Sequence, residues 1–465
     1  MSEVNAVEYV SGLIARARKA QKIAEGYDQA TVDKLCAAIT WATVKEEVAR
    51  KIAKLAYDES QMGVEEAKYV KMQIKPRGAL RDMQGQKSVG IIEEDPAKGL
   101  VKYAKPIGVI GGIAPCTNPE ATPVIKSMFA IKGRNAIVFA PHPRTKKTNA
   151  YICELMRAAL KKYGAPEDLI IAIEEPTLDI TNELMKQCDL IVATGGGGLV
   201  KAAYASGTPA YGVGAGNAVV IIDETADLDD ACEKVMRSKT FDYATSCSAD
   251  NSIMVKDTVY DAVIEKLKGQ GGYLCSADEK AKLQAVMFLP DGHLNPKAGL
   301  AAQAPEVIAK AAGISIPDGT KFMMVESTGF GAEHPFSGEK LSVILNVYKY
   351  ADFDKAIEMI NDIHEWSGKG HSCGIHTKDT ARVHKLAERT YTSRIMVNLP
   401  TSAANSGNWF NGMPFSLSLG CGSWGGNASS ENITWKHMIN TTWVSSPIPV
   451  SVPSDEELFG DIMKD

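Results

Sequence analysis

The residue with the greatest chemical potential in this sequence is Cys247, which stands among small polar neighbours in the stretch 242–249 (DYATSCSA). The stretch is predicted to follow a helix and precede a strand, and its small side chains leave room for a carbonyl to reach the sulfur. A thiolate can attack an aldehyde and form a thiohemiacetal, whose hydride is then available to a nicotinamide. Taken alone, a single cysteine is more often a small buried hydrophobe than a nucleophile.

A second stretch, 114–119 (APCTNP), could assist such a nucleophile through the side-chain amide of Asn118. An alkoxide that develops on an attacked carbonyl needs a fixed N–H donor, which contributes roughly 3 kcal/mol in comparable sites. Thr117 or Asn118 could instead cap the helix that follows, and from this stretch alone capping is the favoured interpretation. Both roles are compatible if one residue caps and the other points at a substrate.

Two glycine-rich stretches could bring the backbone close to a ligand. Residues 194–198 (TGGGG) are predicted to follow a strand and open a helix, where backbone amides at the positive helix end suit a pyrophosphate. The pattern is neither GxGxxG nor a P-loop, so a plain tight turn explains it almost as well. Residues 212–217 (GVGAGN) suit close packing around a ligand, or a turn into the next strand.

His371, Cys373 and His376 superficially resemble a metal-binding cluster. Successive residues of a strand point to opposite faces, and the sequence offers no matching ligands at zinc spacing elsewhere. We therefore predict no metal site.

Strand and helix patterns alternate along most of the chain, which predicts an α/β fold with a doubly wound parallel sheet. The N-terminal part, before the first predicted strand, carries apolar side chains at helical spacing. From residue 89 onward, short and continuously apolar runs are typical of strands covered on both faces. The predicted strand–helix pairs are 107–113 with 120–132, 136–140 with 144–163, 169–173 with 178–187, 190–193 with 197–206, and 219–222 with 227–240.

A second series of the same kind begins near residue 241 and predicts a second α/β domain. The stretch 402–426 is expected to be an ordered loop system, because aromatic residues are interleaved among its glycines and serines. We therefore expect one domain over 1–240, a second over 241–427, and a C-terminal segment over 428–465. The strands of the second series are expected at 252–255, 322–325, 343–347, 374–376 and 395–398, and its helices at 258–268 and 352–363.

The bulk composition excludes several classes of function. The net charge is −5 over 465 residues, and the positive charges are scattered, so neither nucleic acid nor an anionic membrane is an expected partner. Apolar runs are far shorter than the roughly 20 residues of a membrane span. The N-terminus has no pattern of a secretory signal, and the nine single cysteines suit a reducing cytoplasm, which is the expected location.

Taken together and in this order, the motifs resemble the aldehyde dehydrogenase superfamily over nearly the whole chain. The similarity is greatest to CoA-acylating members: acylating sulfoacetaldehyde dehydrogenases, CoA-acylating succinate-semialdehyde dehydrogenases, and the acetaldehyde dehydrogenase domains of bifunctional aldehyde–alcohol dehydrogenases. The stretches that carry the resemblance are 132–135 (KGRN), 141–144 (PHPR), 193–196 (ATGG), 200–204 (VKAAY) and 419–427 (LGCGSWGGN).

The resemblance implies a fold and a role for each matched position. The implied fold is a Rossmann-like cofactor domain, an α/β catalytic domain and a small β-flap, formed by 88–105 and 428–450, through which dimers or tetramers assemble. Cys247 matches the nucleophile, Asn118 the oxyanion-hole amide with the backbone N–H of Cys247, and His371 a residue that could help acyl transfer. Glu339 matches the carboxylate on the nicotinamide ribose. The other implied cofactor contacts are Ile113, Ala114, Pro115, Cys116, Thr117, Asn118, Pro141, Thr194, Gly195, Gly196, Gly214 and Leu419.

The most informative departure from the hydrolytic relatives is Val213, which lies in the glycine-containing motif upstream of the nucleophile. Hydrolytic relatives carry a glutamate there to activate water. A hydrocarbon side chain accepts no proton, so thioester hydrolysis loses its general base and a CoA thiolate becomes the expected acceptor.

The cofactor-binding motif also differs from that of many relatives, because the stretch 140–143 (APHP) lacks the glutamate that those relatives place on the adenosine ribose. The cations Arg144, Lys146 and Lys147 follow it, so NADP is slightly favoured over NAD. Some relatives with this motif use NAD, and both cofactors stay open.

The expected reaction is the reversible oxidation of a short aldehyde to its acyl-CoA with NAD(P)+. The stretch 99–106 (GLVKYAKP) looks most like the sulfoacetaldehyde enzymes, which favours an anionic aldehyde, with sulfoacetaldehyde ahead of succinic semialdehyde and acetaldehyde. The alternatives are a hydrolytic dehydrogenase that releases the free acid, phosphate-dependent chemistry like that of glutamyl-phosphate reductase, and a non-catalytic nucleotide-binding protein of the same fold.

Overall fold

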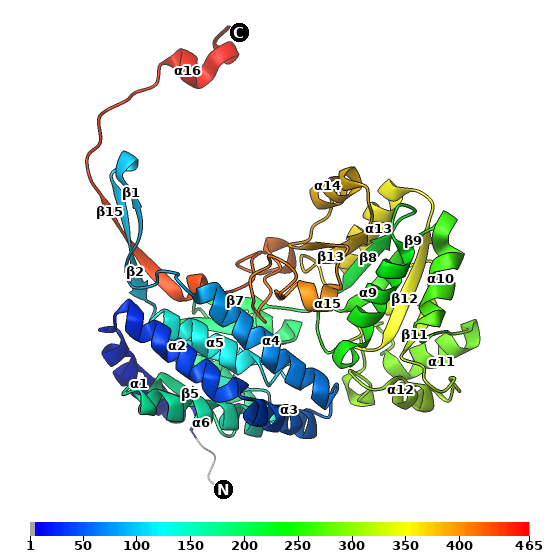
Figure 1. The fold of residues 1–465 in the computed structure, drawn as a ribbon, viewed down its shortest axis with the longest axis horizontal. Coiled ribbons are helices and arrows are strands. Elements are labelled where there is room, and N and C mark those ends of the chain that lie inside the picture. The colour runs from blue at the N-terminus through cyan, green and yellow to red at the C-terminus, as the bar shows by residue number, and fades with distance from the viewer. Residues whose placement is uncertain (1–4, 465) are drawn as a thin grey trace.

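Two parallel β-sheets form the centres of two halves of the molecule, in a computed structural model that describes residues 5–464 (Figure 1). The first half has a five-stranded sheet with the order β5-β4-β3-β6-β7, and the second a seven-stranded sheet with the order β10-β11-β12-β9-β8-β13-β14. A three-stranded antiparallel sheet, β1-β2-β15, projects from the first half. This arrangement confirms the predicted α/β fold.

The first half is a doubly wound sheet with helices on both faces. Helices α5 and α6 follow β3 and β4 and pack against one another, while α1 packs with α7 and also contacts β4. Every residue of β3 and β4 is buried, as expected for strands covered on both sides. The strands are β3 (Val109–Ala114), β4 (Ala136–Pro141), β5 (Ile170–Ala172), β6 (Leu190–Thr194) and β7 (Ala210–Val213). The helices are α1 (Ala6–Ala24), α2 (Gln29–Val44), α3 (Glu46–Ser60), α4 (Glu65–Met83), α5 (Thr122–Lys132), α6 (Lys146–Lys162), α7 (Leu178–Gln187) and α8 (Gly197–Ala205).

The second half buries alternate residues of its strands in two separate cores. Val220 and Ile222 of β8 pack in the core with α9 and α10, whereas Val219 and Ile221 pack in the core with α13 and α14. The strands are β8 (Ala218–Ile222), β9 (Asp250–Lys256), β10 (Gly272–Leu274), β11 (Phe322–Glu326), β12 (Ile344–Tyr350), β13 (Cys373–His376) and β14 (Ile395–Val397). The helices are α9 (Leu228–Thr240), α10 (Tyr260–Gly269), α11 (Ala277–Met287), α12 (Pro305–Ala312), α13 (Phe353–Trp366), α14 (Thr380–Arg389) and α15 (Thr401–Ala404).

One predicted strand belongs to a different sheet from the one expected. The pattern places the run 219–222 in the first series, but β8 pairs in parallel with β9 and β13 of the seven-stranded sheet. A continuously apolar run indicates that a strand is buried on both faces and carries no information on which neighbours it pairs with. The two sheets therefore divide between β7 and β8, and the assignment of the cofactor to 1–240 and catalysis to 241–427 stays a prediction.

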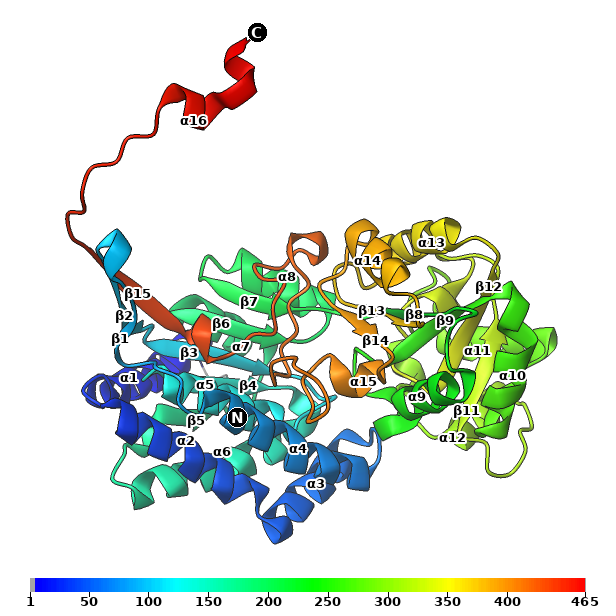
Figure 2. The ribbon, with the colours of Figure 1, turned by 45° about the horizontal axis from the view of Figure 1, so that its top comes forward.

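The segments predicted to form a flap lie together. Strands β1 (Gly90–Asp95), β2 (Leu100–Pro106) and β15 (Ile439–Ser445) form one sheet, although β15 comes from the far end of the chain. Beyond β15 the chain leads away from both halves, and α16 (Asp455–Phe459) lies far from either sheet (Figures 1 and 2). Apolar side chains along this arm are exposed, among them Val450, Leu458 and Ile462.

Over residues 5–464, no helix is both long and apolar enough to cross a membrane. Within the same range, no group of three or more His, Cys, Asp or Glu side chains is placed to hold a metal ion.

Candidate active site

Cys247 lies in a strained loop between α9 and β9. Three consecutive non-glycine residues before it adopt left-handed backbone angles: φ is 52° at Asp242, 47° at Tyr243 and 58° at Ala244. Each such residue costs roughly 1–2 kcal/mol relative to the ordinary helical conformation. The loop therefore keeps this shape only because other contacts hold it.

Asp242 provides those contacts. Its Oδ1 accepts the backbone N–H of Val64 at 2.7 Å, and its Oδ2 accepts Nζ of Lys71 and Oγ1 of Thr245, both at 2.7 Å. Nζ of Lys68 lies 3.4 Å from the same Oδ2. Burial alone would raise the pKa of Asp242, but Lys71 and Lys68 hold that pKa below its ordinary value. Because both lysines come from α4, this cluster joins the Cys247 loop of the second half to a helix of the first.

The same lysine orients Asn118. Nζ of Lys71 donates to Oδ1 of Asn118 at 2.7 Å and also lies 2.6 Å from Oε1 of Glu120. An ammonium group only donates hydrogen bonds, so Oδ1 must be the atom facing Lys71, and Nδ2 is the amide atom left for a ligand. Asn118 lines both cavities that meet at Cys247. The arrangement can present a fixed N–H donor beside the sulfur.

Helix capping, the competing interpretation of Thr117 and Asn118, is wrong. Helix α5 begins at Thr122 after Ala121, and none of the described side chains caps its first turn. The backbone carbonyl of Asn118, not its side chain, accepts from Thr122, through both Oγ1 at 2.7 Å and N–H at 3.3 Å. The Asn118 amide is thus free of the capping role.

His371 is the basic group that contacts the thiol. Its Nε2 lies 3.2 Å from Sγ of Cys247, and its Nδ1 lies 2.8 Å from Oγ of Ser372. With the ring proton on Nδ1 and donated to Ser372, Nε2 is a free acceptor for the thiol proton. The fold thus brings together around one sulfur three residues that the sequence also indicates, Cys247, Asn118 and His371.

The resting pair is a neutral thiol beside a neutral imidazole. Burial raises the pKa of Cys247 to about 12, and Glu339 and Cys421 act in the same direction, whereas Arg394 opposes them. Burial, with Arg394 and His364, lowers the pKa of His371 well below its ordinary value. The proton therefore stays on sulfur until a substrate or cofactor changes the surroundings.

Arg394 is a buried cation behind the site. Its Nη2 donates to the carbonyls of His371 and Gly420, both at 2.8 Å, and its side chain is almost fully buried. The guanidinium thereby fixes the backbone that carries the imidazole. It also adds a positive charge that favours the thiolate of Cys247.

One of the two cavities at Cys247, here called the glycine cavity, is lined by the residues expected to hold a dinucleotide. It measures about 520 Å³ and lies at the carboxyl ends of β3, β4 and β6, where open α/β sheets bind ligands. Leu419, predicted to touch the cofactor, instead lines the second cavity. All the other predicted cofactor residues line the glycine cavity: Ile113, Ala114, Pro115, Cys116, Thr117, Asn118, Pro141, Thr194, Gly195, Gly196, Gly214 and Glu339.

The polar groups of the glycine cavity fit a nicotinamide dinucleotide. Helix α8 begins after Gly196 with no side-chain cap from the described residues, so its first backbone amides are available to a phosphate. Oε1 of Glu339 accepts the backbone N–H of Gly216 at 2.9 Å. Burial raises the pKa of Glu339 to about 7, although the Gly216 N–H counteracts it. A ribose hydroxyl can donate to this carboxylate.

The position at which hydrolytic relatives were expected to carry a catalytic glutamate is occupied here by Val213, which has apolar surroundings. Val213 ends β7 and packs in the core of the first half. Glu339 is the one acidic residue among the described residues that line either cavity, and it is tied to Gly216.

Two of the three cations expected near the adenosine end, Arg144 and Lys146, have other partners. Nζ of Lys146 pairs with Glu175, and the guanidinium of Arg144 donates to the backbone carbonyl of Ser60. Lys147 donates its backbone N–H to Glu59 at 3.0 Å. His142, Pro141 and Pro143 form the wall of the glycine cavity at this end.

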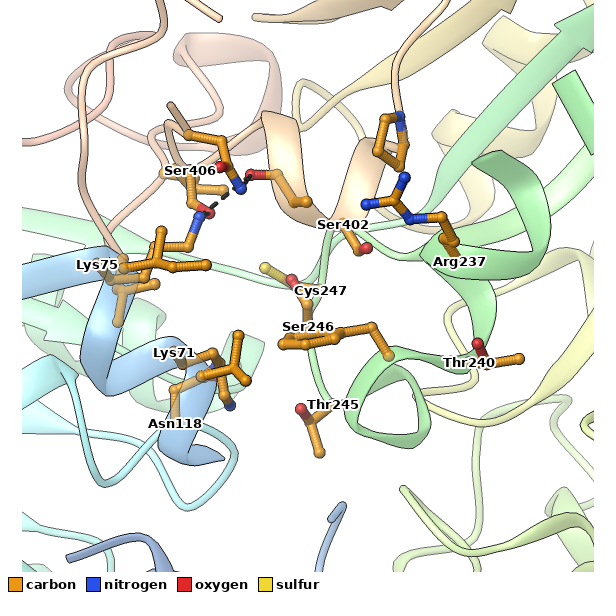
Figure 3. A pocket seen from close by; sticks show the side chains of 18 of the residues that line it. Lys71, Lys75, Asn118, Arg237, Thr240, Thr245, Ser246, Cys247, Ser402 and Ser406 are labelled. Atoms are coloured by element: carbon orange, nitrogen blue, oxygen red, sulfur yellow. Dashed lines mark hydrogen bonds between the residues drawn. The ribbon is translucent and has the colours of Figure 1, made fainter. Parts of the chain in front are cut away.

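The second cavity, here called the lysine cavity, measures about 400 Å³ and also reaches the thiol of Cys247 (Figure 3). Lys71 and Lys75 approach it from α4, Arg237 from α9, and Ser402 and Ser406 from α15 and the loop after it. Figure 3 shows Lys75 and Arg237 on opposite sides, with Cys247 and Ser402 between them.

Sequence reasoning missed the residues that support the site. Lys68, Lys71 and Lys75 are all buried on one face of α4, at spacings of three and four. Lysines at helical spacing on a face that is otherwise apolar or small are a signal that could have been found, because buried lysines require partners. Arg237 and Arg394 offered no comparable signal, because Arg237 stands among other charged residues of α9 and Arg394 is an isolated cation just before β14.

Comparison with known proteins gives consistent matches over nearly the full chain. The profile described as the aldehyde dehydrogenase family matches residues 6–277 and 336–439. The chain is 45% identical to a sulfoacetaldehyde dehydrogenase from Acholeplasma sp, over 97% of this chain and 94% of that protein. It is 44% identical to an acylating sulfoacetaldehyde dehydrogenase from Bilophila wadsworthia, over 98% of each. The crystal structure of an acetylating aldehyde dehydrogenase from Geobacillus thermoglucosidasius matches with a TM-score of 0.93 at 38% identity, covering 98% of this chain and 100% of that one.

Proposed function

The chain belongs to the aldehyde dehydrogenase family, on its CoA-acylating branch, and from this premise we propose that it converts a short anionic aldehyde, sulfoacetaldehyde first, to its acyl-CoA through a thioester on Cys247. One observation carries the proposal. The Cys247 thiol lies 3.2 Å from a neutral imidazole and opens on two cavities, both of which Asn118 also lines.

In the first step, Sγ of Cys247 forms a bond to the aldehyde carbon while its proton passes to Nε2 of His371. The developing oxyanion is stabilised by Nδ2–H of Asn118 and by the backbone N–H of Cys247. Bound NAD(P)+ supplies the hydride acceptor, and Glu339 and the amides that begin α8 are the groups that would hold it. The product of this half-reaction is an acyl group on sulfur.

In the second step, the sulfur of CoA attacks the acyl carbon and Cys247 leaves as the thiolate. His371, once it has released the first proton, accepts the proton of the CoA thiol and can return it to Cys247. The imidazole is suited to both transfers because it starts neutral. Neither step consumes a water molecule.

The hydrolytic alternative lacks its base. Val213 offers no proton acceptor, and Glu339 is held by the Gly216 N–H. Water at the thioester would then compete poorly with CoA. This favours acyl-CoA over the free acid as the product.

The substrate assignment rests on the two relatives at 44% and 45% identity, which are named sulfoacetaldehyde dehydrogenases. Succinic semialdehyde and acetaldehyde are the other candidates. For the cofactor, we propose NADP+ or NAD+, with NADP+ slightly favoured because 140–143 offers no carboxylate to repel a 2′-phosphate.

The test is an aldehyde panel with both cofactors, run with and without CoA. We expect NAD(P)H formation that requires CoA, with acyl-CoA identified by mass spectrometry and sulfoacetaldehyde giving the highest kcat/KM. The Cys247→Ala variant should lose the reaction. Full-rate NAD(P)H formation without CoA would establish the hydrolytic alternative. Turnover that depends on phosphate would establish the phosphate-dependent alternative. Cofactor binding without any turnover would establish the non-catalytic alternative.

We also propose that the protein acts as a homo-oligomer, a dimer or tetramer, in the cytoplasm. The exposed apolar arm after β15, with Val450, Leu458 and Ile462, has contacts to gain from another copy. All nine cysteines lie in the described part of the chain and are free, as suits a reducing compartment. Light scattering on the full chain and on a version ending at residue 447 tests the assembly, which should weaken without the arm.

A further inference from the structure

We propose that Lys75 and Arg237 form the subsite of the lysine cavity that binds the anionic group of the aldehyde, and so determine specificity for charged over neutral substrates. The inference rests on the proposed function, because it assumes that the aldehyde reaches Cys247 from this cavity. To the proposed function it adds the residues that recognise the negative charge of the aldehyde.

The lining of the lysine cavity has an excess of positive charge. Lys71, Lys75 and Arg237 line it, and among the described residues that do so there is no aspartate or glutamate. Lys71 is neutralised from behind by Asp242 and Glu120. Of the other two, Lys75 has only neutral hydrogen-bond partners within the described chain, and Arg237 has only the exposed Glu233 as a carboxylate partner there.

Lys75 is a buried amino group whose hydrogen-bond partners are all neutral. Its Nζ donates to Oγ of Ser406 at 2.7 Å, to the carbonyl of Gly407 at 2.6 Å and to the carbonyl of Ala403 at 3.1 Å. Burial lowers the pKa of Lys75 to about 7, and Lys71 adds to the effect. A buried charge without a counter-ion is costly, and an anion in the adjoining cavity would supply one. Since its three donors are already used, Lys75 acts through its charge and through Oγ of Ser406.

Arg237 can contact the anionic group of the aldehyde directly. Its side chain points from α9 toward the middle of the cavity (Figure 3) and is 56% exposed. Its carboxylate partner is Glu233, at 3.4 Å and itself 43% exposed, which is a weak surface pair. A guanidinium donates two parallel hydrogen bonds to a sulfonate or carboxylate, and it can turn from Glu233 to do so.

Neutral donors complete the subsite. The hydroxyls of Ser246 and Ser402 lie between the two cations, next to Cys247 (Figure 3). Oγ of Ser246 lies 2.8 Å from Oγ of Ser248, so only one of these two hydroxyls donates along that contact. A sulfonate offers three acceptor oxygens, which matches one guanidinium and two hydroxyls better than a neutral alkyl chain does.

A merely structural role makes a different prediction. If Lys75 only ties α4 to the loop 403–407, its loss should affect all aldehydes equally. If Arg237 is only a surface residue, its loss should affect none. The ratio of kcat/KM for sulfoacetaldehyde to that for propionaldehyde separates these possibilities, because it cancels any general damage to the site.

The kinetic experiment compares Lys75→Met, Arg237→Gln and a control, Lys234→Gln. Lys234 lies on α9, one turn before Arg237, pairs with Asp230, and lines neither cavity. We expect the ratio to fall about 10- to 100-fold in each of the first two variants, as for a lost hydrogen bond or contact to a charged group. It should stay within about twofold in the control. An unchanged ratio in both Lys75→Met and Arg237→Gln overturns the proposal, and Arg237→Gln, being on an exposed surface, decides the matter if Lys75→Met does not fold.

A second experiment needs no turnover. Alkylation of Cys247 by iodoacetamide is followed by peptide mass spectrometry, with ethanesulfonate or the neutral ethyl methyl sulfone as protecting probe. Ethanesulfonate should slow alkylation of the unaltered protein and of Lys234→Gln, but not of Lys75→Met or Arg237→Gln. Equal protection by both probes, or none by ethanesulfonate, contradicts the subsite.

The two experiments separate the failure of this inference from that of the proposed function. If the protein makes acyl-CoA but prefers propionaldehyde to sulfoacetaldehyde, the acylating chemistry stands and the subsite is wrong. If it makes no acyl-CoA from any aldehyde, the proposed function fails, and the alkylation result alone decides whether an anion binds beside Cys247.

Discussion

Nζ of Lys71 donates a 2.7 Å hydrogen bond to Oδ1 of Asn118 and a second, of the same length, to Oδ2 of Asp242. One buried ammonium therefore determines which atom of the amide faces the site and also supports the left-handed turn that carries Cys247. The proposed oxyanion donor and the proposed nucleophile are positioned by the same side chain, although they are far apart in the sequence.

Replacing Lys71 by methionine should release the Asn118 amide. We expect kcat/KM to fall roughly tenfold or more, because the amide no longer has a fixed orientation, approaching the 10²–10³-fold loss expected for Asn118→Ala. Lys68→Met is the matched control, since Lys68 shares Asp242 but makes no contact with Asn118. Both variants should unfold at lower temperature, as a buried carboxylate loses a partner. Equal kinetic losses in the two would refute the orienting role.

The reactivity of Cys247 should rise steadily with pH. Burial raises its pKa to about 12, so the thiolate is a minor species at neutral pH and its population grows about tenfold per pH unit. We expect the rate of iodoacetamide labelling of the free enzyme to increase up to at least pH 9 without levelling, as measured on the Cys247 peptide. A plateau near pH 7 would mean that the thiol is already activated in the resting enzyme.

His371→Gln should remove the proton acceptor of the thiol. We expect kcat/KM to drop by about 10²–10⁴-fold, with partial recovery in added imidazole. Because the pKa of His371 is well below its ordinary value, the normal enzyme should show no loss from this group as pH falls from 8 to 6.5. His376→Gln is the control: His376 is also buried, and burial lowers its pKa to about 4, but the imidazole that contacts the Cys247 thiol is that of His371. Similar losses in both variants would assign His371 a structural role only.

Glu339→Gln should change how stability depends on pH. The pKa of Glu339 is raised to about 7 by burial, so the folded chain keeps a proton that the unfolded chain loses near its ordinary value of 4.5. The stability that this proton contributes is present below pH 4.5 and is lost as pH rises through 7. We expect the two proteins to melt alike near pH 5 and the variant to melt about 2 °C or more higher at pH 8.5.

Calorimetry of Glu339→Gln at pH 5, 6, 7 and 8.5 provides the measurement, with Glu333→Gln, a change of an exposed neighbour, as the comparison. A constant difference across this pH range would show that Glu339 does not titrate there. Since the same carboxylate is proposed to hold the ribose, NAD(P)+ should raise the melting temperature of the variant less than that of the normal enzyme.

Much of the fold was predictable because its determinants are local. Strands β3, β4 and β6 are continuous apolar runs, and their helices follow at helical spacing, so the predicted and observed bounds nearly coincide. The partner of β8 was not predictable, because pairing is decided by neighbours distant in sequence. The same distinction between local determinants and contacts distant in sequence holds for the site residues.

Cys247 and Asn118 were found as motifs with small or restrained neighbours. By contrast, the 3.2 Å approach of His371 to Cys247 joins two positions separated by 124 in the sequence, and the contact of Lys71 with Asn118 joins two separated by 47. Resemblance suggested the first of these and nothing suggested the second. Leu419 shows the limit of resemblance, since its backbone neighbourhood was matched while its side chain faces the other cavity.

The proposed reacting groups are divided between the two halves: the amide of Asn118 belongs to the half with the five-stranded sheet, and Cys247 and His371 belong to the half with the seven-stranded sheet. Neither half can turn over substrate alone, and a shift of about 1 Å between them is enough to slow catalysis by roughly 10²-fold. Enzyme activity is therefore more sensitive to the relative position of the two halves than any spectroscopic signal of helix or strand content. In a urea titration, activity should disappear while the circular dichroism of both sheets and their helices is still intact.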